Sequence, residues 1–449
     1  MKLNIKSTVI SSLTLVLSMF LYLLIGYYLE RTESGSLLIS FSLLFLGFMI
    51  LMYQRITPLL ILIIGLTFRL IFIISLPELS QDFNRFIWDG NLQIIGTNPY
   101  LFKPNYLINT NELFYLSSDL FHGMGELSNS NFSNYPPISQ WMFLAASYLG
   151  ENNIFYSVIY LRIFIIFFEL CIFYISYQIL NILKLPLNRI GWYFLNPLVI
   201  IELTGNLHGE GVMMFFFLLG ILFLQKNKNV QSSIMMALSV GSKLLTLILI
   251  PVFFKKLGIK KYIQYCLLTV FVFSLLWIPY LDHNFSSNYI QTIKLWFNNF
   301  EFNASIYYII REFGFYYKGY NIIQTFGKIL PFILMFIICY FSLFQKNNTL
   351  KRILKSQLLL LTVYFFFATT VHPWYIISLV ALCIFTPYFY PIVWSATVFF
   401  SYSSYTSNGF QENTVLILLE YIIVFSLFLY EMITRRDIIF KAFSKNLAP

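Results

Sequence analysis

Residues 154–183 read IFYSVIYLRIFIIFFELCIFYISYQILNIL, and Arg162 and Glu169 are the two charged side chains in this run. About 20 apolar residues suffice for an α-helix to cross the ~30 Å hydrocarbon core of a membrane. Lipid offers no water to the backbone, so a spanning segment must be a helix or part of a closed barrel. The alternating pattern of a barrel strand is absent. The segment therefore predicts a transmembrane helix.

Similar apolar runs recur from one end of the 449-residue chain to the other. Hydrophobic residues make up 58% and charged residues 11%, with a mean hydropathy of +0.73, whereas a soluble domain carries about 25% charged residues. We predict an all-α fold, a polytopic transmembrane helical bundle with about 11–14 spans. The expected spans are 8–29, 37–53, 57–77, 154–183, 189–204, 210–225, 231–242, 244–255, 262–281, 322–344, 355–370, 375–387, 389–405 and 414–433.

Basic residues set the expected orientation. They cluster in short segments at alternate helix ends, which predicts a cytoplasmic side that includes both termini. The net charge of +10 is thereby explained without a nucleic-acid partner. The first apolar run is too long for a signal peptide and is expected to be a retained helix. The basic positions are Lys2, Lys6, Arg55 and those within 184–189, 226–228, 255–261, 346–355 and 435–445.

Two polar intervals fall on the opposite, extracytoplasmic side. Residues 78–153 carry seven acidic side chains against Arg85 and Lys103, and residues 282–321 are rich in Asn and Tyr. Structureless loops of this length are unusual in compact proteins, so both intervals are expected to contain short helices along the membrane interface. Because the sequence contains no linker, residues 1–449 are expected to form one membrane domain.

The strongest local motif is Ser80-Gln81-Asp82-Phe83-Asn84-Arg85-Phe86-Ile87-Trp88-Asp89-Gly90. Ser80 suits a helix N-cap. On a helix, Asp82, Arg85 and Asp89 share one face, which sets two carboxylates beside a guanidinium. This pattern fits either a solvated helix face or a catalytic one, because a positioned carboxylate is a suitable general base.

Charged residues also occur inside or beside the expected spans, and five of them are candidates for a specific role: Arg69, Arg162, Glu169, Glu202 and Lys243. Such residues are costly in lipid and usually face a partner or a cavity. For Arg69 and Arg162 we expect either an internal ion pair or a side chain that extends to the interface from a helix end. Glu169 and Glu202 are the natural partners for such pairs. Lys243 lies between two short apolar segments, where it can reach an anionic group or extend to the interface.

Two histidines lie in polar turns on the extracytoplasmic side. His208 precedes Glu210, and His372 begins a turn that reads His-Pro-Trp-Tyr. Asp82, Asp89, His208 and Glu210 are metal-ligand types, but their spacing specifies no metal site, and a divalent cation is not indicated. Nucleotide-binding motifs are also absent, and nothing indicates a cofactor. The four cysteines lie in apolar runs and predict no disulfide.

Several of these motifs together resemble bacterial GT-C glycosyltransferases, in particular the polyprenyl-phosphate-mannose-dependent mannosyltransferases. The similarity covers roughly residues 55–390. The sequence departs from the family at Gln81, where an acidic residue is common, and at Glu210, where Asp is usual. Because of these two departures, the motifs do not specify which sugar is transferred. The matching segments are the Asp82–Gly90 block, Gly96-Thr97-Asn98-Pro99-Tyr100, Asn134-Tyr135-Pro136-Pro137, Asn206–Glu210, Gly241-Ser242-Lys243 and His372–Tyr375.

The resemblance implies a multi-pass enzyme of the bacterial inner membrane with an extracytoplasmic active site. It would transfer mannose or another hexose from a polyprenyl-phosphate donor to a glycan or lipid acceptor, normally with inversion. The family's first-loop aspartate falls on Asp82, which makes Asp82 the expected general base and 78–153 the expected catalytic loop. A leaving phosphate needs cations or hydrogen-bond donors. The expected substrate-binding residues are Arg85, Asp89, His208, Glu210, Lys243, Arg311 and His372.

Two other classes of function fit parts of the sequence. A transporter or flippase for a lipid-linked or polar solute would also carry intramembrane charges and broken helices. The two halves of the chain show no internal similarity, which disfavours that reading. A structural component of a polysaccharide export complex would tolerate loss of the Asp82 carboxylate, whereas a transferase would not.

Overall fold

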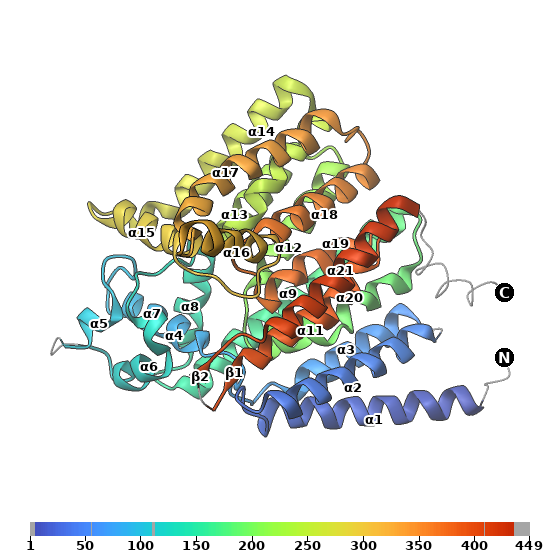
Figure 1. Cartoon of the computed structure of the whole chain (residues 1–449), viewed down its shortest axis with the longest axis horizontal. Coiled ribbons are helices and arrows are strands. Elements are labelled where there is room, and N and C mark those ends of the chain that lie inside the picture. The colour runs from blue at the N-terminus through green and yellow to red at the C-terminus, as the bar shows by residue number, and fades with distance from the viewer. Residues whose placement is uncertain (1–4, 55, 110–112, 408, 435–449) are drawn as a thin grey trace.

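In the computed structural model, which describes residues 5–54, 56–109, 113–407 and 409–434, the chain is a bundle of helices (Figure 1). The only strands among these residues form one two-stranded hairpin. The predicted all-α fold is confirmed. The elements are α1 (Ile5–Tyr27), α2 (Ser34–Tyr53), α3 (Pro58–Ile71), α4 (Asp82–Ile94), α5 (Pro104–Leu107), α6 (Ser117–Gly123), α7 (Gly125–Asn129), α8 (Pro137–Leu149), α9 (Ile154–Leu183), η1 (Leu187–Ile190), α10 (Gly191–Phe194), α11 (Pro197–Val199), η2 (Ile200–Gly205), α12 (Glu210–Gln225), α13 (Asn229–Ser242), η3 (Leu244–Phe253), α14 (Phe254–Trp277), η4 (Ile278–Tyr280), α15 (Phe285–Asn298), α16 (Ile306–Lys318), α17 (Ile323–Cys339), η5 (Tyr340–Phe344), α18 (Leu350–Phe367), η6 (Pro373–Ile376), α19 (Ile377–Cys383), α20 (Tyr390–Thr397), η7 (Val398–Ser404), β1 (Tyr405–Thr406), β2 (Gly409–Phe410) and α21 (Thr414–Thr434).

Six helices within the described ranges are long and apolar enough to cross a membrane, or seven if one bent pair is counted as a span. This count is lower than the expected 11–14, because several expected spans are short or broken helices packed inside the bundle. The six are Ile10–Tyr27, Ser34–Tyr53, Ile154–Leu183, Leu244–Tyr280, Ile323–Phe344 and Thr414–Thr434.

Two breaks in the helices position polar groups inside the bundle. The segments Pro197–Gly205 and Glu210–Gln225 meet at an angle of 112°, and Leu207 between them has a φ of 66°. Lys243 has an extended backbone (φ −159°, ψ 132°) that ends α13 and precedes the 3₁₀ helix η3. The expected interruption at Gly241-Ser242-Lys243 is therefore present. Each break ends a helix beside a side chain singled out in the sequence.

Buried charges inside the bundle are satisfied locally. Arg69 forms an ion pair with Glu169 (Nη2–Oε1 2.5 Å), and both side chains are fully buried. This pair was expected. Arg162 instead donates to the backbone carbonyls of Ile73, Thr204 and Gly205, which are freed by the neighbouring helix ends. An unpaired buried charge would be destabilising, so these contacts allow the charges to remain in an apolar bundle.

The two polar intervals contain short helices, as expected. Helices α4 to α8 fold together at one end of the molecule (Figure 1). Helices α4 and α8 pack closely, with the rings of Phe86 and Phe143 stacked at 4.5 Å. Close approach is possible because Gly90 has no side chain; a Cβ there would lie 2.2 Å from Ser147 Oγ. Helices α15 and α16 belong to the second interval.

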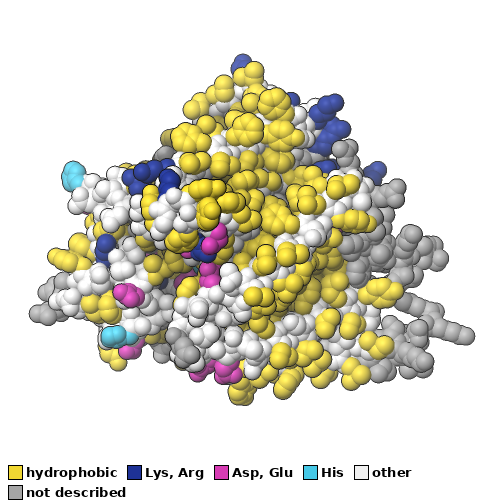
Figure 2. Space-filling model, viewed as in Figure 1, with side chains coloured by type: hydrophobic (Ala, Val, Ile, Leu, Met, Phe, Trp, Pro, Cys, Tyr) yellow, Lys and Arg dark blue, Asp and Glu magenta, His cyan; other side chains and the backbone are white. Residues whose placement is uncertain are grey.

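Helix ends and surface composition agree with a membrane protein. The start of α1 and the end of α21 lie at the same end of the bundle, opposite α4–α8 and the β hairpin (Figure 1). Hydrophobic side chains cover much of the surface formed by the long helices (Figure 2). Exposed examples include Phe20 on α1, Phe271 on α14 and Phe336 on α17. The basic positions at Lys2, Arg55 and 435–445 lie outside the described residues.

Candidate active site

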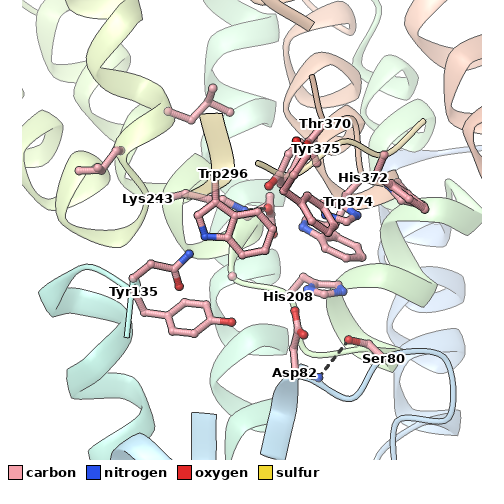
Figure 3. Close-up of a pocket in the computed structure, with 18 of the residues that line it drawn as sticks. Ser80, Asp82, Tyr135, His208, Lys243, Trp296, Thr370, His372, Trp374 and Tyr375 are labelled. Atoms are coloured by element: carbon pink, nitrogen blue, oxygen red, sulfur yellow. Dashed lines mark hydrogen bonds and ion pairs between the residues drawn. The ribbon is translucent and has the colours of Figure 1, made fainter. Parts of the chain in front are cut away.

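A cavity of about 630 Å³ lies where α4 and α8 of the first polar interval meet the long helices. This volume is typical of small-molecule sites. Its wall includes five of the predicted site residues: Asp82, His208, Glu210, Lys243 and His372. They come from four separate segments of the chain, and Figure 3 shows several of their side chains converging on one space.

Asp82 is the first residue of α4 and faces this cavity (Figure 3). Gln81 occupies the N-cap position, one residue later than expected, while Ser80 Oγ accepts a hydrogen bond from the Asp82 backbone N–H at 3.3 Å. Burial raises the pKa of Asp82 to about 6, although the charges of Lys243 and Arg31 partly offset this effect. The pKa of this carboxyl is therefore closer to neutral pH than that of a free aspartate, in the range that suits a general base.

Lys243 and Glu210 form an ion pair in the cavity wall. The Lys243 ammonium lies 4.6 Å from the centre of the Tyr375 ring, a favourable cation–π position. Glu210 begins α12 and is 1% exposed, and its Oε2 accepts no hydrogen bond from the described residues. Lys243 keeps donors beyond the one that Glu210 uses, since an ammonium carries three.

His208 and His372 enclose the indole of Trp374. Its ring centroid is 3.7 Å from that of His208 and 4.3 Å from that of His372, with nearly parallel planes (Figure 3). Burial and the charge of Lys243 lower the pKa of His372 to about 3, so this imidazole is neutral at physiological pH. It can therefore serve as a hydrogen-bond donor or acceptor, but not as a cation.

His372 is positioned by a contact that is remote in sequence. Phe302 and Thr370 form an isolated parallel bridge, with Phe302 N–H donating to the Thr369 carbonyl at 3.1 Å. The Phe302 ring also stacks on His372 at 4.8 Å. The second polar interval thus fixes the turn that carries His372.

Tyr135, from one of the motif segments, also borders the cavity (Figure 3). Tyr100 is fully buried, and its hydroxyl donates to the Tyr135 carbonyl at 2.5 Å. Asn98 donates to the Tyr280 carbonyl at 2.8 Å. The Asn98-Pro99-Tyr100 motif therefore positions the cavity wall rather than lining it.

Arg85 and Asp89 lie outside the cavity, although they share α4 with Asp82. Arg85 Nε pairs with Asp89 Oδ1 at 2.8 Å, and its Nη1 donates to the carbonyls of Ser128 and Asn131. Asp89 is fully buried and accepts hydrogen bonds from Ser133 (2.5 Å) and Gln140 (2.8 Å). These contacts tie α4 to α8 and to the segment between α7 and α8.

Arg311 also lies away from the cavity. It pairs with Glu301 at 2.6 Å and with Glu312 at 3.2 Å, and it covers the Tyr308 ring. Its charge is therefore engaged on the surface of the second polar interval. The cations that line the cavity are Lys243 and Arg31, and Arg31 was not singled out in the sequence.

No three or more His, Cys, Asp or Glu side chains gather as possible metal ligands within the described residues. The set Asp82, Asp89, His208 and Glu210 is not brought together, because Asp89 faces Ser133 and Gln140 instead of the cavity. The cavity wall instead combines two carboxylates, Asp82 and Glu210, with two cations and two imidazoles.

The fold and the cavity define a polytopic membrane protein whose reactive groups gather at one end of a helical bundle. Residues 25–256 match the family model described as alpha-(1→6)-mannopyranosyltransferase, N-terminal domain. This region is just over half of the chain, and the protein belongs to that family. No curated protein shows a significant sequence match.

Family membership confirms the resemblance to membrane mannosyltransferases and identifies the protein as a glycosyltransferase. The matched region contains Asp82, His208, Glu210 and Lys243. His372, Trp374 and Tyr375 line the same cavity but follow the matched region. The site therefore requires both halves of the chain.

Proposed function

We propose that the protein transfers mannose from a polyprenyl-phosphate donor to an extracytoplasmic glycan or lipid acceptor, with inversion and with Asp82 as general base. The observation that carries this proposal is the position of Asp82 in the wall of the cavity that also contains Lys243. A base and a cation in one enclosed site are the two groups that this substitution needs.

Asp82 would accept the proton of an acceptor hydroxyl as its oxygen forms a bond to the anomeric carbon. The bond from that carbon to the phosphate oxygen breaks, and the phosphate leaves with the electron pair. Attack from the face opposite the phosphate inverts the configuration. Among the predicted cations, Lys243 is placed to stabilise the charge that develops on the phosphate, and His208 and His372 offer neutral N–H groups.

The apolar part of the cavity suits the tail of a lipid donor. Leu244, Leu247 and Ile248 from η3 line it, together with Leu330 and Leu334 from α17. Leu247 is 53% exposed on the surface of the bundle, so the cavity wall reaches the region occupied by lipid. A membrane-embedded donor could enter there without leaving the bilayer, which accounts for an active site in a membrane protein.

The first test is mannosyl transfer by purified protein supplied with polyprenyl-phosphate mannose. We expect Asp82→Asn to lower turnover at least about 100-fold, because removing a positioned base costs roughly this factor. Asp119→Asn makes the same chemical change on an exposed position of α6 and should keep full activity. Full activity of Asp82→Asn would overturn the assigned base. Donor binding without release of polyprenyl phosphate by the wild type would instead favour a flippase or transporter.

A further inference from the structure

Arg31 is a cationic side chain of the cavity that lies far from the motifs. It belongs to the segment between α1 and α2 and is half-buried. Its guanidinium carbon lies 4.1 Å from the centre of the Tyr405 ring. Among the described residues, Arg31 forms no ion pair, whereas Lys243 is already paired with Glu210. Arg31 therefore keeps its hydrogen-bond donors available to a ligand.

The cavity has two ends of different chemistry. The apolar end is formed by η3 and α17 and contains Lys243 at its border. The other end is formed by Arg31 and the hairpin residues Tyr405 and Phe410. In Figure 1, α17 lies in the upper part of the molecule and the β hairpin in the lower part. Phe410 is 56% exposed, so this second end also reaches the surface.

Asp82 lies within the electrostatic reach of both cations, since Lys243 and Arg31 each lower its pKa against the effect of burial. A general base must lie beside the acceptor hydroxyl, and the leaving phosphate must lie across the reacting carbon from it. If the lipid donor occupies the apolar end with its phosphate at Lys243, the acceptor approaches from the end that contains Arg31.

The chemistry of this second end favours a hydroxyl-rich molecule. A guanidinium presents five N–H donors in a rigid plane, and stacking on Tyr405 fixes that plane. Tyr402, in the same wall, is fixed by a hydrogen bond from its hydroxyl to Glu202 at 2.7 Å. Hydrocarbon placed here would leave the Arg31 donors without hydrogen-bond partners, which is unfavourable. Sugar hydroxyls would satisfy them.

We infer that Arg31, held against Tyr405, binds the acceptor, and that this acceptor is a glycan rather than a lipid. The inference rests on the proposed function and adds to it the class of acceptor and a residue that recognises it. Arg31 then acts in acceptor binding, while Asp82 performs the proton transfer and Lys243 contacts the donor.

The test is steady-state kinetics with polyprenyl-phosphate mannose as donor and a soluble α-(1→6)-linked mannotriose as acceptor. We expect Arg31→Met to raise the KM for mannotriose by about 10-fold or more, since a charged hydrogen bond contributes about 1.5–3 kcal/mol. The KM for the donor should change by less than about twofold in the same variant. Arg31→Lys should recover part of the loss, because it restores the charge but not the planar fork.

Arg352→Met is the matched control, because Arg352 is exposed on α18 and outside the cavity. It should leave both KM values unchanged. A rise in the donor KM alone for Arg31→Met would overturn the inference and assign Arg31 to the phosphate. Transfer by the wild type to a diacylglycerol-linked mannose but not to mannotriose would also overturn it. No release of polyprenyl phosphate by the wild type, by contrast, would count against the proposed function itself.

Discussion

Asp82 and Asp89 are the same residue type on the same helix, but their surroundings differ. Asp82 faces the cavity, whereas Asp89 is fully buried and bound by Arg85, Ser133 and Gln140. Helical spacing predicts that Asp82 and Asp89 lie on one face of the helix. It does not predict which of the two carboxylates borders a cavity. That difference depends on α8 and the segment before it.

Reaction rate should depend on pH through Asp82. Its pKa is raised from 3.8 to about 6, and a general base works only when it is deprotonated. We expect kcat/KM to be constant above about pH 7 and to fall about tenfold per pH unit below pH 6. A pH–rate profile with a fixed donor checks this expectation. Asp119→Asn should show the same profile, and a flat rate down to pH 5 would contradict it.

The raised pKa of Asp82 affects stability in the opposite direction: the rate is expected to rise with pH, whereas the stability of the fold decreases. The folded state favours the protonated Asp82 carboxyl, so its stabilising contribution is complete below the unfolded pKa of about 3.9 and is lost as pH rises through about 6. At neutral pH the ionised Asp82 carboxyl therefore destabilises the fold, as is common for groups in active sites.

The position of Arg31 in the cavity could not be predicted from the sequence. Asp82, His208, Glu210, Lys243 and His372 stand in recognisable local patterns, and all five line the cavity. Arg31 stands in no pattern, because its partner Tyr405 lies far along the chain. A contact of this kind depends on tertiary packing.

At the level of elements, hydropathy predicts where helices form better than how far they extend. The runs 37–53, 154–183 and 414–433 correspond closely to α2, α9 and α21. The expected spans 189–204 and 231–242 correspond to short or interrupted helices. Apolar composition identifies burial, but burial against protein and burial in lipid give the same sequence signal.

Packing of α4 against α8 should be sensitive to Gly90. A Cβ at this position would lie 2.2 Å from Ser147 Oγ and 2.4 Å from the Phe143 carbonyl oxygen. Gly90→Ala must separate the two helices, and overpacking typically costs about 1–3 kcal/mol. We expect a lower unfolding temperature in detergent and reduced activity, because Asp82 begins the same helix.

Gly35→Ala is the control for this change. Gly35 lies in α2, and a Cβ there meets nothing within 4 Å. The substitution should be neutral or slightly stabilising, since Ala is the better helix former by about 1 kcal/mol. Equal unfolding temperatures for Gly90→Ala and wild type would show that α4 and α8 can shift apart without cost.

For the whole molecule, the class of fold followed from composition alone, because backbone groups in lipid allow few structures. The family was indicated by motifs and is confirmed by the match over 25–256. Cytoplasmic termini and an extracytoplasmic site remain predictions from the basic segments. The placement of α4–α8 opposite the start of α1 and the end of α21 is compatible with them (Figure 1).

If the lipid donor enters beside Leu247, the length of its tail should matter. Leu247→Asn places an amide where the tail would pass, and loss of one buried leucine contact corresponds to about 1.5–3 kcal/mol. We expect the KM of a long-chain polyprenyl donor to rise about tenfold on this scale, and that of a short-chain donor to change little. Parallel kinetics with the two donors measure the difference.

Leu418→Asn is the matched control, because Leu418 is 62% exposed on α21 and does not line the cavity. It should affect neither donor. An equal effect of Leu247→Asn on both donors would place the tail elsewhere and would leave the role of Asp82 unaffected.

Because the cavity is closed by residues as far along the chain as Tyr405, its assembly has a fixed order in time. Asp82 leaves the ribosome early, but the His372 turn and the hairpin follow roughly 15–65 s later at synthesis rates of about 5–20 residues per second. Throughout that interval the nascent chain is inserted but incomplete. We therefore expect transferase activity to begin only when nearly the whole protein has been made.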